Sequence, residues 1–404
     1  MAMVVKNNMS AISTLNTLNK NSSALSKSLQ KVSSGMKING AADDASGYAI
    51  SERMRVQIRG LDQANQNTQN GSSMMKVAEG AVSSTVDILK TLKEKVINAA
   101  NDTNTDADRQ TIQKELDQSI DQINDNANVT YNGKYLVDGS HNSKVTPTTT
   151  AMTNQSLNTN ATFASAFTSL TDRNGNSLNI QSSDTITLSY VKEGKTNTVT
   201  ITAGTASISD LIGKVSTDLT TGEATSVIGK DVAGDTVYTA DGKPALTIKA
   251  AADGIEGQIS GITFSVTDTK GNVKKSANAL LDNFSESIRA QNQSNDNSIN
   301  LQVGTKSNQA IKVGLTDMRA EALGLQAKDG TTLNISTKEY ANAAINVLDS
   351  AVQKALDQQT TIGAVQSRLE YTSSNLTTAS ENVQASESTI RDADMAKEMT
   401  NYTK

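Results

Sequence analysis

The sequence predicts a mainly α-helical, elongated protein. In this fold class, N- and C-terminal segments form a long coiled-coil-like helical bundle, and a central α+β domain is inserted between them. Apolar residues with heptad spacing occupy both ends of the 404-residue chain, and alternating strand patterns fill its middle. The composition, with 3% aromatic residues and no Trp or Cys, suits narrow helical seams better than one large globular core.

The first predicted helix covers about residues 11 to 36, where apolar residues recur at alternating spacings of four and three. This stripe includes Leu15, Leu18, Leu25, Leu29 and Val32. Gly35 and the segment 37–40 then provide the chemistry that ends a helix. We expect the stripe to face another helix.

A second helix is predicted over about residues 45 to 100, with the same spacing interrupted by polar residues. At about 1.5 Å per residue it would be roughly 80 Å long, which a single globule would rarely contain. The stretch 108–128 has one apolar face and predicts an antiparallel helix. Asn132 and Gly133 indicate a tight hairpin after it.

The middle of the chain, residues 141 to 295, is rich in Thr, Ser, Gly and Asp. Alternating runs predict strands at 185–191, 198–203, 245–251 and 259–268. The stretch 207–215 predicts a short helix that opens with an approximate capping box, Ser-x-x-Asp. This region is therefore interpreted as an inserted α+β domain.

Helical spacing returns from 345 to 390, where apolar residues are seven positions apart. They are Leu348, Ala355, Ile362, Leu369, Leu376, Val383 and Ile390. Two terminal seams then flank one insertion, which favours a bundle in which the N- and C-terminal helices pack side by side.

The composition excludes several function classes. A formal charge of −5 gives no general attraction to nucleic acid or to anionic membranes. The single His, His141, cannot build a multi-His metal site within one chain, and no Gly-rich phosphate loop occurs. The segment 102–108 imitates the start of a calcium loop, but Ala107 and Gln113 replace the Gly and Glu that it needs. We expect no enzyme activity and no cofactor.

Asp43 and Asp44 are adjacent acids that allow two interpretations. They could be catalytic, which would require an apolar pocket and a partner acid or base that their neighbours do not offer. They could instead begin the long helix by capping its free N–H groups. We favour the second interpretation, because the small residues around them suit close packing of another chain segment.

The two ends of the chain closely resemble the terminal regions of bacterial flagellin. The resemblance rests on NMSAISTLNTLNKNSSALSKSLQKVSSGMKINGAADDASGYAISERMRVQIRGLDQANQN and on IGAVQSRLEYTSSNLTTASENVQASESTIRDADMAKEM. It covers about residues 4 to 140 and 300 to 404, in order, with a variable insert between. It implies a structural subunit of the extracellular flagellar filament that assembles with copies of itself. Export through the flagellar type III apparatus would account for a start that lacks the apolar core of a secretory signal.

The resemblance also implies a division into functional segments. Residues 1–42 would be the N-terminal filament-core helix, with Leu15, Leu18, Leu25, Leu29 and Val32 as its seam. Residues 43–140 and 296–392 would be the two halves of a helical shell, 141–295 a variable surface-exposed insert, and 393–404 the start of the C-terminal core segment. Asp43, Asp44, Arg53, Arg55 and Arg59 are candidates for the helix start and for packing between subunits. A flagellar export chaperone and a filament cap are further implied partners.

Flagellins continue past the RDADMAKEM-like segment with a further helix that pairs with the N-terminal one, whereas this sequence stops at Lys404. We therefore expect residues 1 to about 40 to be disordered or adhesive in a monomer, and self-assembly to be weak.

Many flagellins are recognised by Toll-like receptor 5. The family's contact Arg and Leu fall here on Thr91 and Lys95, while its contact Glu is retained as Glu115. Losing an Arg anchor can cost about 2 kcal/mol at an interface, so we expect weak recognition. The alternative is that these three residues are solvated helix faces.

Three alternative functions remain open at this stage. A hook-filament junction protein shares the terminal pattern less closely, and its copy number and position on the flagellum would distinguish it. An enzyme displayed in the insert would be revealed by activity screening. A monomeric secreted immune ligand or adhesin would be tested by binding assays.

Overall fold

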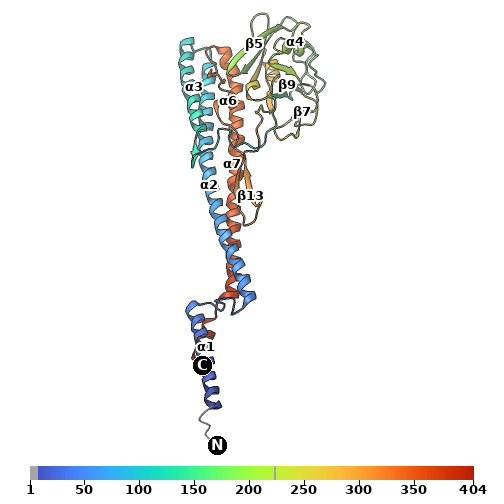
Figure 1. Cartoon of the computed structure of the whole chain (residues 1–404). Helices are drawn as coiled ribbons and strands as arrows, with labels where there is room; N and C mark the ends of the chain where they lie inside the picture. Colours follow the sequence, from blue (N-terminus) through green and yellow to red (C-terminus); the bar gives the residue numbers. More distant parts are fainter. Residues whose placement is uncertain (1–7, 223) are drawn as a thin grey trace. The chain divides into compact units, whose positions relative to one another are not determined.

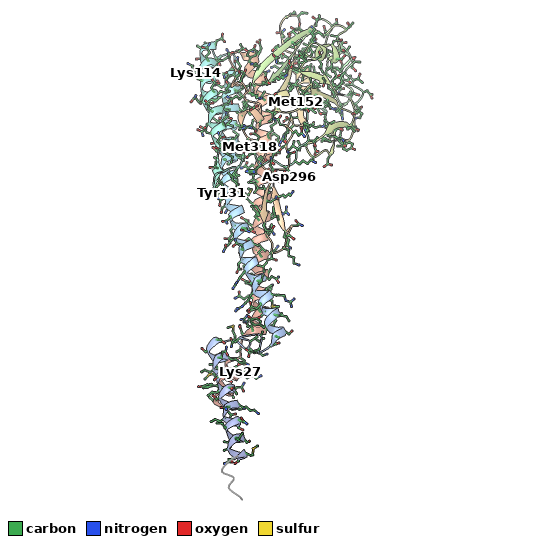
Figure 2. All side chains as sticks on the ribbon, in the orientation of Figure 1. Lys27, Lys114, Tyr131, Met152, Asp296 and Met318 are labelled. Atoms are coloured by element: carbon green, nitrogen blue, oxygen red, sulfur yellow. The ribbon has the colours of Figure 1, made fainter. Side chains whose placement is uncertain are left out.

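The computed structural model describes residues 8–222 and 224–404, and Figure 2 draws their side chains. The chain divides into two compact units. Unit 1 contains the described residues up to Ser72 together with Leu301–Ile311 and Ser367–Lys404. Unit 2 contains Ser73–Asn300 and Lys312–Gln366. The two longest helices, α2 and α7, contribute residues to both units (Figure 1).

The long helices of the described chain, α1, α2 and α7, lie where the heptad patterns predict helices. Their bounds are α1 Met9–Ser34, α2 Ala45–Ala99, α3 Asp106–Ala127, α4 Ile208–Gly213, α5 Lys275–Leu281, α6 Ala320–Leu323, α7 Lys338–Arg391 and α8 Met395–Thr403. The predicted helices at 45–100, 108–128 and 345–390 are confirmed by α2, α3 and α7. Helical ends and a strand-rich middle therefore describe this fold.

The strands form small antiparallel sheets in the described residues. They are β1 Thr130–Tyr131, β2 Lys134–Tyr135, β3 Ala151–Asn154, β4 Thr185–Lys192, β5 Lys195–Thr202, β6 Leu219–Thr221, β7 Val227–Lys230, β8 Thr236–Tyr238, β9 Leu246–Ala250, β10 Ile259–Thr267, β11 Phe284–Ile288, β12 Ile299–Gln302 and β13 Ala310–Val313. The sheet orders are β10-β4-β5, β11-β3-β9-β6, and the pairs β1-β2, β7-β8 and β12-β13. The predicted hairpin is confirmed, since Asn132 and Gly133 both have positive φ between β1 and β2.

Polar residues in the helical seams of α2 and α7 pair with one another in an antiparallel order. In unit 2, Gln366 donates to Glu79 at 2.7 Å, and Lys93 pairs with Asp349. In unit 1, Ser373 donates to Asn65 at 2.7 Å and Ser380 to Asp62 at 3.1 Å. Because each of these groups finds its partner in only one alignment, the polar pairs fix the register that the apolar positions alone would leave loose.

In unit 1 the tip of the β12–β13 hairpin lies against α2. The helical residues Gly60 and Gly71 make room for it, because a Cβ at either position would lie within 3 Å of Thr305 or Leu301. Asn67 then donates from Nδ2 to the Gln302 carbonyl at 3.2 Å. Glycine at these two positions inside α2 therefore allows a close approach of the chain.

Unit 2 contains a large apolar core between its sheets. Phe167, Ile186 and Leu188 are fully buried there, packed with residues of β9, β10, α4 and α5. The predicted short helix is confirmed as α4, whose capping box joins Ser207 and Asp210 in both directions. In the helical part of unit 2, α3 returns alongside α2 (Figure 1), and the buried Leu, Ile, Val and Met side chains of these two helices lie outside the cluster between the sheets.

The segment that imitates a calcium loop forms the start of α3. Thr105 caps the helix and Asp108 completes a capping box, so these side chains satisfy backbone N–H groups. Arg109, 6% exposed, donates to the carbonyls of Ala99 and Asn101 at 2.9 and 3.0 Å and pairs with Asp106. It thereby satisfies carbonyls at the C-terminal end of α2.

Candidate functional site

The helices α1 and α8 carry an uncovered apolar surface in unit 1. Leu15, Leu18, Leu25 and Leu29 are 57%, 64%, 48% and 53% exposed. Val32, the last residue of the predicted seam, is half-buried. We define the terminal apolar surface as the four leucines of α1 together with three exposed residues of α8, Met395, Met399 and Tyr402. Burying a large apolar side chain is worth about 1.5–3 kcal/mol, so this surface favours a partner.

The helix α1 is regular although no residue of its described length is buried. The Asn8 side chain accepts from the Ala11 N–H at 3.2 Å, and Gly35 ends the helix with a φ of 70°. Met9–Ser34 is therefore helical, in contrast to the expectation of disorder for this part of residues 1 to about 40, and caps at both of its ends help to define it; residues 1–7 lie outside the described residues. Adhesiveness stays a prediction, and α8 lies beside α1 (Figure 1).

Two short connections meet where α1 leads to α2 and α7 leads to α8. The Lys37 N–H donates to the Arg391 carbonyl at 2.7 Å, and the Ala393 N–H donates to the Gly35 carbonyl at 2.9 Å. Met36 and Asp392 form an isolated antiparallel bridge between them. We call these connections, residues 35–44 and 391–394, the helix joint. Its backbone bonds tie two distant parts of the sequence together.

The side chain of Arg391 organises the helix joint. It is 6% exposed, and its Nη1 donates to Glu52 Oε1 at 2.6 Å and to Ser51 Oγ at 3.3 Å. Its Nε lies 3.3 Å from Met36 Sδ, and its guanidinium stands 5.5 Å from the centre of the Tyr48 ring. The hydrogen bond from Arg391 lowers the pKa of Glu52 below its ordinary value. The guanidinium of Arg391 thus joins its own connection both to α2 and to Met36 in the other connection.

Asp43 and Asp44 lie at the start of α2 within the helix joint. Asp44 Oδ1 accepts from the N–H groups of Ser46 and Gly47, both at 3.0 Å, and Asp43 Oδ2 accepts from the Asn39 N–H at 3.1 Å. A Cβ at Gly47 would lie 2.7 Å from Ile38 Cδ1, so the chain's own Ile38 fills the space beside this small residue. Packing of another subunit here stays a prediction.

The three arginines predicted to contact other subunits have different surroundings. Arg55 Nε donates to Glu387 Oε1 of α7 at 3.1 Å, so this residue serves the helix pair inside unit 1. Arg53 is exposed and donates to the Ala49 carbonyl of its own helix at 3.4 Å. Arg59 is exposed and makes no ion pair with a described residue. Arg53 and Arg59 therefore remain available to a partner.

The receptor-contact candidates lie on α2 and α3 in unit 2. Lys95 Nζ is 3.0 Å from Glu115 Oε1, so the structure pairs two of them as an exposed ion pair. Thr91, one turn before Lys95, donates to the Asp87 carbonyl at 3.0 Å. Glu115 is thus engaged by a cation of its own chain.

Sequence reasoning did not single out Arg391, Glu52 or Tyr48. The available signal was a cation in the last turn of a helix followed by Asp392 and Asp394, a pattern that favours a helix end with capping contacts. Its partners lie more than 300 positions away, with a separation of 339 to Glu52. Local pattern reading cannot supply such a pairing.

Within residues 8–222 and 224–404, no helix combines the length and apolar character that a membrane span requires. No group of three or more His, Asp or Glu side chains in the described part of the chain gathers closely enough to hold a metal ion.

Known proteins share both terminal regions of this sequence. Residues 5–142 match the bacterial flagellin N-terminal helical region, and residues 345–404 match the bacterial flagellin C-terminal helical region. A flagellin from Clostridium tyrobutyricum is 34% identical over 405 residues, covering 100% of this chain and 95% of that protein. This chain belongs to the bacterial flagellin family.

Other similarities agree with that assignment. A flagellin from Bacillus subtilis (strain 168) is 28% identical, covering 100% of this chain and 91% of that protein. Flagellins are structural proteins, and this chain is a structural subunit of the bacterial flagellar filament. The flagellar junction protein FlgL from Legionella pneumophila matches at 16% identity and a TM-score of 0.35, covering 85% of this chain and 99% of that one. A likeness of that size does not distinguish junction from filament.

Proposed function

We propose that this flagellin joins the extracellular filament through its terminal apolar surface, and that the helix joint sets the direction in which that surface is presented. Burial carries the proposal: the leucines of α1 are about half exposed or more, in a helix that is fully formed. Contiguous exposed apolar side chains mark contact sites in soluble proteins. Copies of the same chain, each with the same surface, would cover one another.

The proposal is tested by replacing two members of the surface. The variant Leu18→Ser with Leu25→Ser should lose incorporation onto filament seeds, measured by sedimentation and electron microscopy. A matched control is Ile97→Ser, which removes an apolar residue of similar exposure, 50%, from the helical part of unit 2. Normal incorporation of the double variant, or an equal loss in the control, would contradict the proposal. The same microscopy tests whether the 404-residue chain polymerises without seeds.

Charged contacts between subunits are a second part of the proposal. Arg53 and Arg59 are exposed on α2, whereas Arg55 already pairs with Glu387. Arg59→Glu should reduce incorporation and leave the melting temperature of the monomer unchanged. Arg55→Glu should instead lower the thermal stability of unit 1, because it places a like charge beside Glu387. If both reversals incorporate normally, these arginines do not make subunit contacts.

We also propose that Toll-like receptor 5 recognises this flagellin weakly. Thr91 occupies the position of the family's contact Arg. Lys95 forms an ion pair with Glu115 at 3.0 Å, so this carboxylate already has a partner in its own chain. The variant Thr91→Arg with Lys95→Leu should supply the Arg and release Glu115, and should raise the response of receptor reporter cells at least tenfold. An equally potent response by the unmodified chain would refute weak recognition. The export chaperone and the filament cap remain expected partners, testable by pull-down with full-length chain.

A further inference from the structure

One face of the β10-β4-β5 sheet in unit 2 consists of hydroxyl side chains. The strand registers align them in three rows across the sheet. These rows are Thr263–Ser189–Thr198, Ser265–Thr187–Thr200 and Thr267–Thr185–Thr202. We call these nine residues the hydroxyl face. Strands lie about 4.8 Å apart and every second residue is about 6.7 Å along a strand, so the hydroxyl groups form a regular grid.

The opposite face of the same strands belongs to the core of unit 2. Ile186, Leu188 and Phe264 alternate with the hydroxyl residues and are at most 2% exposed. Alternation explains why one face is polar, and the preference of Thr for strands explains part of its composition. Neither explains why seven of the nine residues of the hydroxyl face, all but Thr185 and Thr202, line a hollow.

The hollow above the hydroxyl face has a volume of about 920 Å³. Its floor includes Thr187, Thr200 and Ser265, and α5 and the first turns of α7 supply wall residues such as Asn278 and Asn342. Strand β5, labelled in Figure 1, is one of the two edge strands of this sheet. Sites that hold small molecules usually enclose about 300–1,000 Å³, so the hollow is large enough for a ligand.

The hydroxyl groups of the floor keep unused hydrogen-bonding capacity. Ser189 and Thr198 are 3.4 Å apart and Thr187 and Thr200 are 3.5 Å apart, so each pair shares one hydrogen bond. A hydroxyl offers one donor and two acceptor positions. Each pair therefore retains one donor and several acceptors for a molecule in the hollow, while the Thr methyl groups supply apolar contact beside them.

The charges around the hollow favour a neutral ligand. Lys338 is already paired with Asp102 at 2.5 Å. Asp282 Oδ1 accepts from the Phe264 N–H at 3.2 Å and lies 3.4 Å from Asn346 Nδ2. Lys275 and Glu339 at the rim have opposite signs. An ionic ligand would therefore find no excess of opposite charge.

We propose that the hydroxyl face and its hollow bind a neutral carbohydrate of about disaccharide size. Such a molecule presents alternating donors, acceptors and C–H surface, which matches hydroxyl pairs separated by methyl groups. This site would give each exposed filament subunit a weak adhesive contact that is independent of the terminal apolar surface. Repetition along a filament would multiply weak contacts into avidity.

The test is a saturation-transfer NMR titration of the full chain with free maltose, cellobiose, lactose and chitobiose at millimolar concentrations. We expect transfer to at least one of these probes. The variant Thr187→Val with Thr200→Val keeps the shape of the floor and removes one hydroxyl pair, and it should weaken that binding about tenfold. Thr236→Val, on β8 and outside the hollow, is the matched control and should bind as the unmodified chain does.

Two outcomes would overturn the assignment. One is the absence of transfer to every probe. The other is equal binding by the Thr187→Val, Thr200→Val variant while its circular dichroism spectrum and melting temperature match those of the unmodified chain. A third variant, Thr200→Arg, places a long side chain in the hollow and should abolish binding; retained binding would also contradict the proposal.

Discussion

Unit 2 buries most of its large apolar residues, whereas unit 1 leaves many of its own exposed. In unit 2, residues such as Phe167 and Leu188 have no exposed surface. In unit 1, Leu61, Ala64 and Leu376 form one small buried cluster, while Leu18 is 64% and Tyr371 is 74% exposed. The same contrast occurs along α7: Leu348 and Ile362 in unit 2 are fully buried, Leu376 in unit 1 is 9% exposed, and Val383 is half-buried.

This contrast indicates two sources of stability. A domain with a closed core gains its stability within one molecule. A helical segment with an uncovered stripe gains most of its stability from whatever covers that stripe. Unit 2 is therefore expected to be stable in the monomer, and unit 1 to be stabilised mainly on incorporation into the filament. The following predictions test that difference.

The largest effect is expected at the core of unit 2. Phe167→Ala should lower the free energy of unfolding of unit 2 by about 3–5 kcal/mol, because it leaves a cavity in a fully packed site. Denaturant titration followed by circular dichroism measures it. Leu18→Ala is the counterpart in unit 1 and should change monomer stability by less than about 0.5 kcal/mol. Similar costs for the two substitutions would abolish the contrast.

A smaller loss is expected at the helix joint. Arg391→Ala removes the hydrogen bonds of a buried cation to Glu52 and Ser51, so it should destabilise unit 1 by less than Phe167→Ala destabilises unit 2. Hydrogen exchange of residues 36–52 should accelerate while exchange in the sheets of unit 2 stays the same. Arg391→Lys should recover part of the protection, since it keeps the charge but not the planar fork. Unchanged exchange at the joint in Arg391→Ala would remove its assigned role.

Asp282 in unit 2 should make stability depend on pH. Burial raises the pKa of its carboxyl group from 3.8 to about 6. A raised carboxyl pKa favours the protonated folded state, so its contribution is complete below about pH 4 and is lost as the pH rises through about 6. Asp282→Asn should therefore stabilise unit 2 at pH 7.5 by about 1–2 kcal/mol, allowing for the group's partial exposure.

The pH profile of thermal unfolding measures this effect. At pH 4 the melting temperatures of the Asp282→Asn variant and of the unmodified chain should coincide. A difference of the same size at both pH values would point to packing, not to titration.

The smallest effect is expected for the exposed ion pair of Lys95 and Glu115. Both side chains are largely solvated, at 40% and 52% exposure, so Lys95→Ala should cost about 0–1 kcal/mol and less at high salt. Lys90→Ala, which breaks another exposed pair with Asp87, is the matched comparison. A cost well above 1 kcal/mol for Lys95→Ala alone would show that the α2–α3 contact depends on this pair.

The sequence predicted best what depends on local periodicity. The heptads predicted both ends of α2 and the C-terminal end of α7 to within one residue, because an apolar stripe of that length favours a helix. The N-terminal end of α7 lies at Lys338, before the predicted start at 345. The strands β4, β5, β9 and β10 were predicted for the same reason, by alternation. The short strands β3 and β11 were not, since AMTN and FSESI are too brief to show a period.

Contacts between segments far apart in the sequence could not be predicted from local periodicity. The contact of Leu301 on β12 with Gly71 on α2, and the placement of Arg391 beside Glu52, depend on how elements distant in the sequence align. The predicted roles of Arg53 and Arg59 between subunits, and the boundaries of the surface insert, stay predictions. The pairing of Arg55 with Glu387, which joins α2 to α7, also could not be predicted from local pattern.

The antiparallel ladder of α2 and α7 restricts how this protein can change in length during evolution. One residue inserted between Ser373 and Ser380 would rotate the following part of α7 by about 100° and move the next polar group away from Asp62. Insertions tolerated in these helices should therefore be of seven residues or a multiple of seven, with equal numbers added to α2 and to α7. Turns in the strand-rich region have no such register to keep, so we expect their length to vary more than that of the two helices.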